Sequence, residues 1–333
     1  MSNPEEVYTQ PLGLDVGTSR IVVARTVGKK FQYEAQLNAF ITLPYSRLAE
    51  DLLRREGVFH QVSNDELVVA GDDAERFAEI FHAETRRPMK DGVLNPQEPY
   101  ALEVVTRIVG KLLGKASTDH QKVFFSIPSP TIGRDGGIRY HRESIRQILT
   151  ELGYQGTPIE EGLAVVFGEM GASNYSGIGI SCGSGLCNVC LAVLSVPVIS
   201  FSVFKAGDFI DSQSAMVVGE MATRLRVMKE QTFRFNGMTA DRMHNALVVH
   251  YDQVIENLVQ ALRESISAAQ KLPKLTHSVP LVLAGGTAMP DGFVEHFSNA
   301  LRANELPVKL SEVRVAAEPL NSTARGALIA ALS

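Results

Sequence analysis

Tryptophan is absent from this chain of 333 residues, and basic residues form no tract along it. The balance of 32 basic and 37 acidic residues gives a net charge of −5, so nucleic acid is not expected as the main partner. No apolar run reaches the ~18 residues of a membrane-spanning helix, and the N-terminus lacks the basic and apolar segments of a secretion signal. We therefore expect a cytoplasmic protein of about two domains, with no direct membrane anchor visible.

Cysteine is scarce, and its three copies are clustered. Cys182, Cys187 and Cys190 have the spacing C-x4-C-x2-C, which superficially matches part of an iron–sulfur run. A cluster needs a fourth thiolate that the chain lacks, so a metal is the weaker interpretation. The alternative is that these cysteines are small buried apolar residues on adjacent strands. A structural disulfide is not expected in a reducing compartment.

Two common catalytic motifs are also missing. No G-x4-G-K-[ST] phosphate loop and no H-E-x-x-H zinc motif occurs. Residues 179–183 do fit the nucleophile-elbow pattern G-x-S-x-G, with Ser181 as a hydrolase nucleophile. That motif needs a helix after its turn, whereas Ser184 and Gly185 lead into a stretch that reads as a strand. The elbow is therefore the weaker alternative for this segment.

Two distant stretches share one pattern of strand, glycine turn and strand. They are residues 12–23 and 178–189, and only the first keeps an acid, Asp15, at the end of its first strand. Facing glycine hairpins can present backbone N–H groups to a phosphate chain from both sides, while a carboxylate holds the water shell of Mg²⁺. Thr18 and Ser19 add hydroxyl donors. The pair predicts a duplicated nucleotide-phosphate clamp.

Strands and helices alternate along the rest of the chain. Residues 279–284 read as a strand that runs into a glycine-rich segment, 285–292, before another helix. Glycines at such a junction let a flat ring lie against the main chain, although a plain glycine turn is the alternative. Further predicted elements are a hairpin at 12–16 and 20–26, a strand at 123–127, and helices at 99–114, 139–152 and 240–270.

Taken together, these segments resemble the actin-like ATPase superfamily, whose bacterial members include MreB and MamK. Residues 15–19 resemble its first phosphate loop, 178–189 stand at the second, and 285–292 are similar to its adenosine motif. The resemblance implies an α/β actin-like ATPase fold, with two duplicated domains around a nucleotide cleft and a small insertion subdomain in each. The implied bounds are 1–152 with an insertion at about 30–85, and 153–333 with an insertion at about 213–272.

Further segments favour the bacterial filament formers. Residues 87–93 resemble the stretch that leads back from the first insertion, and 205–211 are similar to a Gly-Asp-x-x-Asp segment that includes Gly207 and Asp208. Residues 227–231 look like a Lys-Glu segment that lies beside the ribose and adenine in the family. A solvated pair on a helix is the alternative for that segment.

The resemblance implies ATP or ADP and Mg²⁺ as cofactors, with Asp15 as the metal-holding and catalytic acid. The implied nucleotide-binding residues are Gly17, Thr18, Ser19, Gly183, Ser184, Gly185, Gly207, Asp208, Lys229, Glu230, Gly285, Gly286, Thr287 and Met289.

Departures from the family pattern fall where hydrolysis would occur. Ser181 stands at the usual acid of the second loop, and Leu186 and Cys187 replace its usual threonines. One carboxylate for the metal's water shell is therefore missing, which predicts tight binding with slow ATP hydrolysis. The residue that orients the attacking water would fall near Gly137, and Asp135 is the nearest carboxylate.

The function implied by the resemblance is that of a bacterial actin-related cytoskeletal protein. It would bind ATP with Mg²⁺, act as a slow ATPase, and self-associate head to tail into filaments. The alternative is a non-polymerising ATP-binding adaptor of a membrane-associated complex, of the pilus or cell-division actin kind. A chaperone-type ATPase is disfavoured because the chain ends soon after residues 324–328, with no substrate domain.

Overall fold

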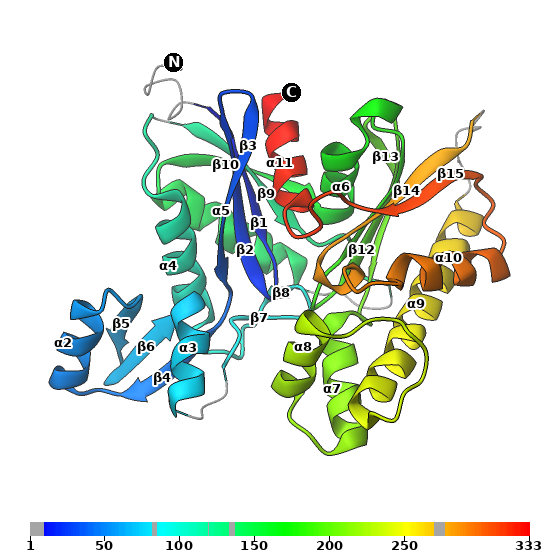
Figure 1. The fold of residues 1–333 in the computed structure, drawn as a ribbon. Helices are drawn as coiled ribbons and strands as arrows, with labels where there is room; N and C mark the ends of the chain where they lie inside the picture. Colours follow the sequence, from blue (N-terminus) through cyan, green and yellow to red (C-terminus); the bar gives the residue numbers. More distant parts are fainter. Residues whose placement is uncertain (1–9, 82–84, 119, 133–136, 270–276) are drawn as a thin grey trace.

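The computed structural model describes residues 10–81, 85–118, 120–132, 137–269 and 277–333. Two five-stranded sheets stand side by side, each with helices on both faces (Figure 1). Within the described residues, no helix is both long enough and apolar enough to cross a bilayer.

The two sheets have the same topology. Each has a central strand that pairs antiparallel with the next strand of its hairpin on one side and parallel with a later strand on the other. The first sheet has the order β10 (Tyr154–Glu160), β9 (Gln121–Ile127), β1 (Leu12–Val16), β2 (Arg20–Val27) and β3 (Lys30–Leu37). The second has the order β13 (Val196–Val203), β12 (Cys187–Val193), β11 (Gly177–Cys182), β14 (Val279–Ala284) and β15 (Leu310–Val315). The predicted duplication is therefore confirmed, with β1–β2 and β11–β12 as equivalent hairpins.

Two helices lie between the sheets, and they need glycine to approach so closely. They are α6 (Glu161–Glu169) and α11 (Ser322–Leu332), which pack against each other and against the inner faces of the sheets. A Cβ on Gly326 would lie 1.7 Å from the Ala164 carbonyl oxygen, and one on Gly13 would lie 2.1 Å from that of Ala324. No larger residue fits at either contact.

The outer faces carry the two largest apolar cores. Branched and aromatic residues of the strands alternate inward and outward, so each strand supplies side chains to both faces. The first core forms under α4 (Ala101–Leu113) and α5 (Ile138–Glu151), and the second under α7 (Gly207–Val218), α9 (Arg242–Ala268) and α10 (Phe293–Ala303). The helices predicted at 99–114, 139–152 and 240–270 correspond to α4, α5 and α9.

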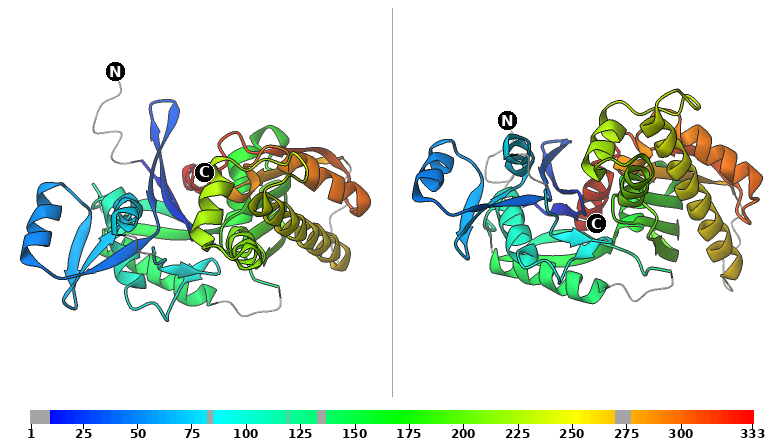
Figure 2. Two further views of the ribbon diagram at one scale, coloured as in Figure 1. Left: turned by 60° about the horizontal axis from the view of Figure 1, so that its bottom comes forward. Right: turned by 90° about the horizontal axis from the view of Figure 1, so that it is seen from below.

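An insertion projects from the side of the first domain (Figure 2). It holds a three-stranded sheet in the order β4 (Phe40–Pro44), β6 (Glu66–Ala70) and β5 (His60–Ser63), with α2 (Arg47–Arg55) and α3 (Asp72–Phe81). The expected insertion range of 30–85 also includes β3, which pairs with β2 in the main sheet. The second expected insertion, 213–272, begins within α7 and covers α8 (Ala222–Gln231) and α9.

Candidate functional site

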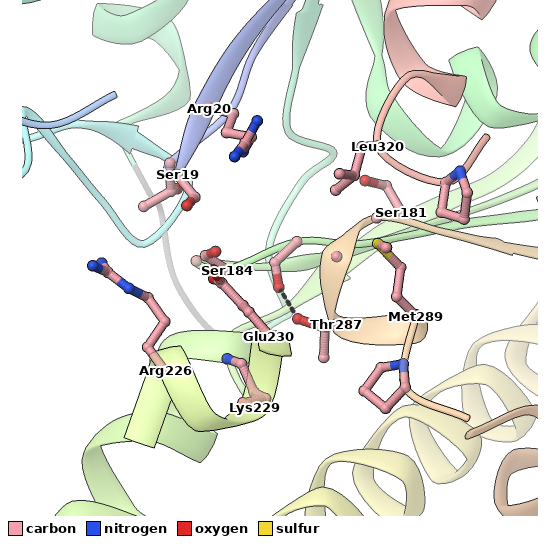
Figure 3. A pocket seen from close by; sticks show the side chains of 18 of the residues that line it. Ser19, Arg20, Ser181, Ser184, Arg226, Lys229, Glu230, Thr287, Met289 and Leu320 are labelled. Atoms are coloured by element: carbon pink, nitrogen blue, oxygen red, sulfur yellow. Dashed lines mark hydrogen bonds between the residues drawn. The ribbon is translucent and has the colours of Figure 1, made fainter. Parts of the chain in front are cut away.

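A cavity of about 550 Å³ lies where the ends of the two equivalent hairpins meet (Figure 3). Residues from both domains form its walls. Asp15, the predicted metal-holding and catalytic acid, is on the walls. The predicted nucleotide-binding residues on the walls are Gly17, Thr18, Ser19, Gly183, Ser184, Gly185, Lys229, Glu230, Gly285, Gly286, Thr287 and Met289.

The two glycine turns face each other across the cavity. Each is a tight turn closed by one backbone bond, from Gly17 N to the Arg20 carbonyl at 2.9 Å and from Gly183 N to the Leu186 carbonyl at 3.0 Å. A Cβ on Gly185 would lie 2.6 Å from the Thr18 hydroxyl oxygen. The turns therefore approach to contact distance, as the predicted clamp requires.

Asp15 lies at the end of β1, with its carboxyl group on the cavity wall. The Ser126 hydroxyl donates a 2.7 Å hydrogen bond to Oδ1 of Asp15 and accepts one of 2.9 Å from Val16 N. Burial raises the pKa of Asp15 to about 6, although the Ser126 hydrogen bond opposes the shift. The acid is thus held in a fixed orientation without a compensating charge.

Ser181 occupies the equivalent position at the end of β11, and its hydroxyl donates a 2.9 Å hydrogen bond to Oε2 of Glu161. Glu161 begins α6 and also lines the cavity. Burial and the nearby charge of Asp15 raise the pKa of Glu161 to about 8, while hydrogen bonds from Ser181 and Asn188 oppose the shift. A carboxyl group therefore stands beside the serine that replaces the expected acid.

Close packing of glycines brings Glu161 to this place. A Cβ on Gly179 of β11 would lie 2.5 Å from the Gly162 carbonyl oxygen, so the start of α6 presses directly on the strand. Sequence reasoning missed Glu161. The acidic pair Glu160-Glu161 ahead of an apolar helix was the available signal.

Asp15 and Glu161 could supply two ligands to a divalent cation, whereas the described residues contain no group of three or more His, Cys, Asp or Glu side chains that could hold a metal ion by itself. Among the described residues, no arginine or lysine forms an ion pair with either carboxyl group. Buried carboxyls with raised pKa values and no counter-charge are stabilised by a hard cation with oxygen ligands. The donor chemistry at this end of the cavity thus suits Mg²⁺.

Gly207 and Asp208 support the second turn from outside the cavity wall. Gly207 N donates to the Gly183 carbonyl at 3.1 Å, and Asp208 N donates to the Ser184 carbonyl at 2.8 Å. The Asp208 carboxylate accepts a 2.6 Å hydrogen bond from Nη1 of Arg87, in the first domain. These residues therefore fix the turn and connect it to the other domain. The predicted Asp135 lies outside the described residues.

Lys229 is buried on α8. Its ammonium group forms an ion pair of 2.6 Å with Asp211 and donates to the Gly207 carbonyl at 3.3 Å. Burial raises the pKa of Asp211, and the charge of Lys229 opposes that rise. Lys229 is thus not a solvated residue, whereas its neighbour Glu230 is exposed at the cavity wall.

The segment after β14 joins the second turn. Gly285 has a φ of 88°, and a Cβ there would lie 2.3 Å from the Cys182 carbonyl oxygen, so the position requires glycine. The Thr287 hydroxyl donates a 2.8 Å hydrogen bond to the Gly183 carbonyl, drawn as a dashed line in Figure 3. Met289 is half-exposed at the cavity wall. The predicted adenosine segment and the second turn therefore form one continuous surface.

The three cysteines are free and buried on β11 and β12, as the apolar interpretation predicted. A strand, rather than a helix, follows the turn after Ser181, so the segment does not form a nucleophile elbow.

A family model described as Volactin matches residues 11–331. The chain belongs to the Volactin family. A search of curated proteins gave no match. The fold is similar to the MamK double helical filament, with a TM-score of 0.73 at 18% identity over 97% of this chain and 98% of that one.

Two further solved structures share the fold of this Volactin family member. MreB5 of Spiroplasma citri bound to AMPPNP has a TM-score of 0.66 at 16% identity, over 95% of this chain and 94% of that one. The ethanolamine utilization protein EutJ from Carboxydothermus hydrogenoformans has a TM-score of 0.53 at 20% identity, over 96% and 88%. The predicted actin-like ATPase fold is confirmed.

Proposed function

We propose that this protein binds ATP in the cavity between its two domains. The observation that carries the proposal is the meeting of three glycine segments, at residues 17–19, 183–185 and 285–287, around one cavity of about 550 Å³. Facing turns offer backbone and hydroxyl donors to phosphates, and the third segment offers a flat glycine surface to a base. The AMPPNP-bound MreB5 and MamK structures of the same fold support a nucleotide in this chain.

Asp15 and Glu161 would hold Mg²⁺ through its water shell. When bound, the cation would neutralise charge on the phosphates. The contribution of the chain is orientation, because Ser126 fixes the Asp15 carboxylate and Ser181 fixes that of Glu161. Glu161 thus takes over part of the role expected of the acid missing at Ser181.

Hydrolysis should be slow. The second carboxylate reaches the site from a helix behind the turn, not from the turn itself, which changes the direction from which the water shell is held. Asp135 stays the proposed water-orienting residue. We therefore expect a slow ATPase that still binds nucleotide tightly through its glycine segments.

We also propose head-to-tail assembly into filaments. In Figure 1, α2 and α7 reach the lower part of the molecule, and the β12–β13 turn lies at the upper edge. Each of these elements carries exposed apolar side chains, which are Leu48 on α2, Met216 on α7, and Leu194 and Val196 at the turn. Different patches at opposite ends suit a heterologous contact, which repeats without closing. The fold of the MamK double helical filament supports this reading.

One experiment tests binding and assembly separately. Purified protein is titrated with a fluorescent ATP analogue in Mg²⁺, and then sedimented and imaged by negative-stain microscopy with ATP, ADP or AMPPNP. Saturable binding and filaments in any nucleotide state are the expected results. Binding by a protein that stays monomeric at all concentrations favours the non-polymerising adaptor, and absence of binding overturns the proposal.

A further inference from the structure

Two cysteines face each other at the base of the second glycine turn. In the register of β11 and β12, Cys182 lies directly opposite Cys187. The adjoining pair, Gly183 and Leu186, carries the backbone hydrogen bond, so the cysteines occupy a non-hydrogen-bonded position. At such positions the two side chains point to the same face of the sheet. The Cα atoms are about 4.5 Å apart, a distance within the range of about 4.4–6.8 Å that a disulfide requires.

The two thiols are neighbours inside one core. Both side chains belong to the same apolar core, with exposed fractions of 1% for Cys182 and 0% for Cys187. The Cys187 thiol, together with burial, holds the pKa of Cys182 well above its usual range. Cys190 lies on the opposite face of β12, in a different core cluster, and is opposite Gly179 in the register. It is therefore a matched control within the same hairpin.

The cysteine pair encloses the turn that lines the cavity. The four residues between the cysteines are 183–186, and all of them are on the cavity wall. Two neighbours hold the turn through the Gly183 carbonyl, which accepts from the Thr287 hydroxyl at 2.8 Å and from Gly207 N at 3.1 Å. The Cys187 thiol also donates to the Lys205 carbonyl at 3.7 Å. These contacts connect the base of the turn to the adenosine segment and to α7.

We propose that Cys182 and Cys187 are an oxidation site, at which a disulfide across the base of the turn lowers nucleotide affinity. The effect on affinity rests on the proposed ATP binding. With a peroxide as oxidant, one thiol forms a sulfenic acid and releases water. The second thiol then attacks that sulfur, which forms the S–S bond and releases a second water. Two electrons pass to the peroxide, and a thiol reductant reverses the step.

Burial sets the conditions for this reaction. The thiolate is the reactive form, and a buried thiol with a raised pKa yields little of it, so oxidation requires the turn to open. An empty cavity allows that opening, whereas a nucleotide against residues 183–186 restrains it. Oxidation should therefore be slow and at least about fivefold slower with saturating ATP.

The test begins with peptide mapping by mass spectrometry, which needs no nucleotide. Wild-type protein, Cys190→Ser and Cys187→Ser are treated with hydrogen peroxide under native conditions. Wild type and Cys190→Ser should form a Cys182–Cys187 crosslink that dithiothreitol removes, and Cys187→Ser should not. Cysteines that stay reduced, or a crosslink that involves Cys190, would overturn the proposal.

Nucleotide affinity is then measured on the same samples. The dissociation constant of a fluorescent ATP analogue should rise at least about fivefold on oxidation of wild type and Cys190→Ser, return after dithiothreitol, and stay constant for Cys187→Ser. A crosslinked protein with unchanged affinity contradicts the regulatory part. Failure of the reduced protein to bind ATP would instead refute the proposed function, and the peptide map would still report on the disulfide.

Discussion

The Ser181 hydroxyl donates a 2.9 Å hydrogen bond to Oε2 of Glu161, so the serine that stands in place of the expected acid touches a carboxyl group from another element. The contact exists because Gly162 and Gly179 let the start of α6 press against β11. The site thus has two carboxyl groups, Asp15 and Glu161, even though its second turn has none.

The pH dependence of stability should depend on Glu161. Its pKa is about 8 in the folded chain and about 4.3 in an unfolded one, so over this range the folded state binds more protons. The contribution of Glu161 to the free energy of unfolding is fully present below pH ~4, and it is lost as the pH rises through about 8. In EDTA without nucleotide, the melting temperature of wild type should fall between pH 7 and 8.5, and that of Glu161→Gln should stay flatter.

The measurement begins at pH 7 because His141 also changes the stability at lower pH. Burial lowers the pKa of His141 to about 4, so its protonation favours the unfolded state and stability from this group rises with pH up to about 6.5. Both variants share this effect. Equal slopes for wild type and Glu161→Gln above pH 7 would contradict the assignment of Glu161.

The effect of replacing Ser181 by an acid should depend on whether residue 161 is a glutamate or a glutamine. Ser181→Asp alone sets two carboxyl groups in contact. In EDTA above pH ~8, where both groups are ionised, we expect a melting temperature lower by several degrees, in line with a repulsion of about 1–2 kcal/mol. Ser181→Asp combined with Glu161→Gln removes the repulsion and supplies an amide donor. That double variant should hydrolyse Mg-ATP within about threefold of wild type or faster, and a rate as low as that of Glu161→Gln alone would contradict the account.

An ion pair across the cavity mouth should slow nucleotide release. Arg226 of α8 is buried and lies 3.3 Å from the carboxylate of Glu75, on α3 of the insertion. Because Glu75 is half-exposed, the pair contributes about 0.2–1 kcal/mol. Glu75→Gln should raise the dissociation rate of a fluorescent ATP analogue about two- to fivefold and weaken its dependence on salt.

Glu79→Gln is the matched control for the ion pair, since Glu79 lies one turn later on α3 and is not on the cavity wall. Unchanged release from both variants would remove the ion pair from the account.

The apolar ends should control assembly. Leu48→Glu on α2 and Leu194→Glu at the β12–β13 turn each set a charge in the proposed head-to-tail contact, and each should raise the critical concentration for pelleting at least about tenfold. Leu102→Glu is the control, because Leu102 is exposed on α4 along the side of the first domain. Loss of pelleting in the control as well would indicate a general effect of charge.

The sequence was sufficient for features that arise from neighbouring residues. The strand–glycine–strand hairpins around Gly17 and Gly183 were predicted, since β-branched runs and tight turns leave local patterns. Gly285 was recognised for a similar reason, and its positive φ explains why glycine stands there. That these segments share one cavity followed from the resemblance, and the structure places them on its walls.

Features that depend on packing between distant elements were not predictable in this way. Glu161 lies 20 residues before Ser181, and their contact depends on how closely a helix approaches a strand. The carboxylate of Asp208, which was predicted as a nucleotide-binding residue, pairs with Arg87 from the other domain. Nothing in the local sequence indicates that an acid of one domain pairs with an arginine of the other.

The central claim is that Glu161 supplies the carboxylate absent from the second turn, and single-turnover hydrolysis of Mg-ATP tests it most directly. Glu160→Gln is the control, because Glu160 accepts a hydrogen bond from Ser129 that glutamine can also accept. We predict that Glu161→Gln lowers the rate at saturating ATP at least about tenfold, which corresponds to an activation barrier higher by about 1.4 kcal/mol. Glu160→Gln should change the rate less than about threefold. Equal rates for Glu161→Gln and wild type would contradict the claim.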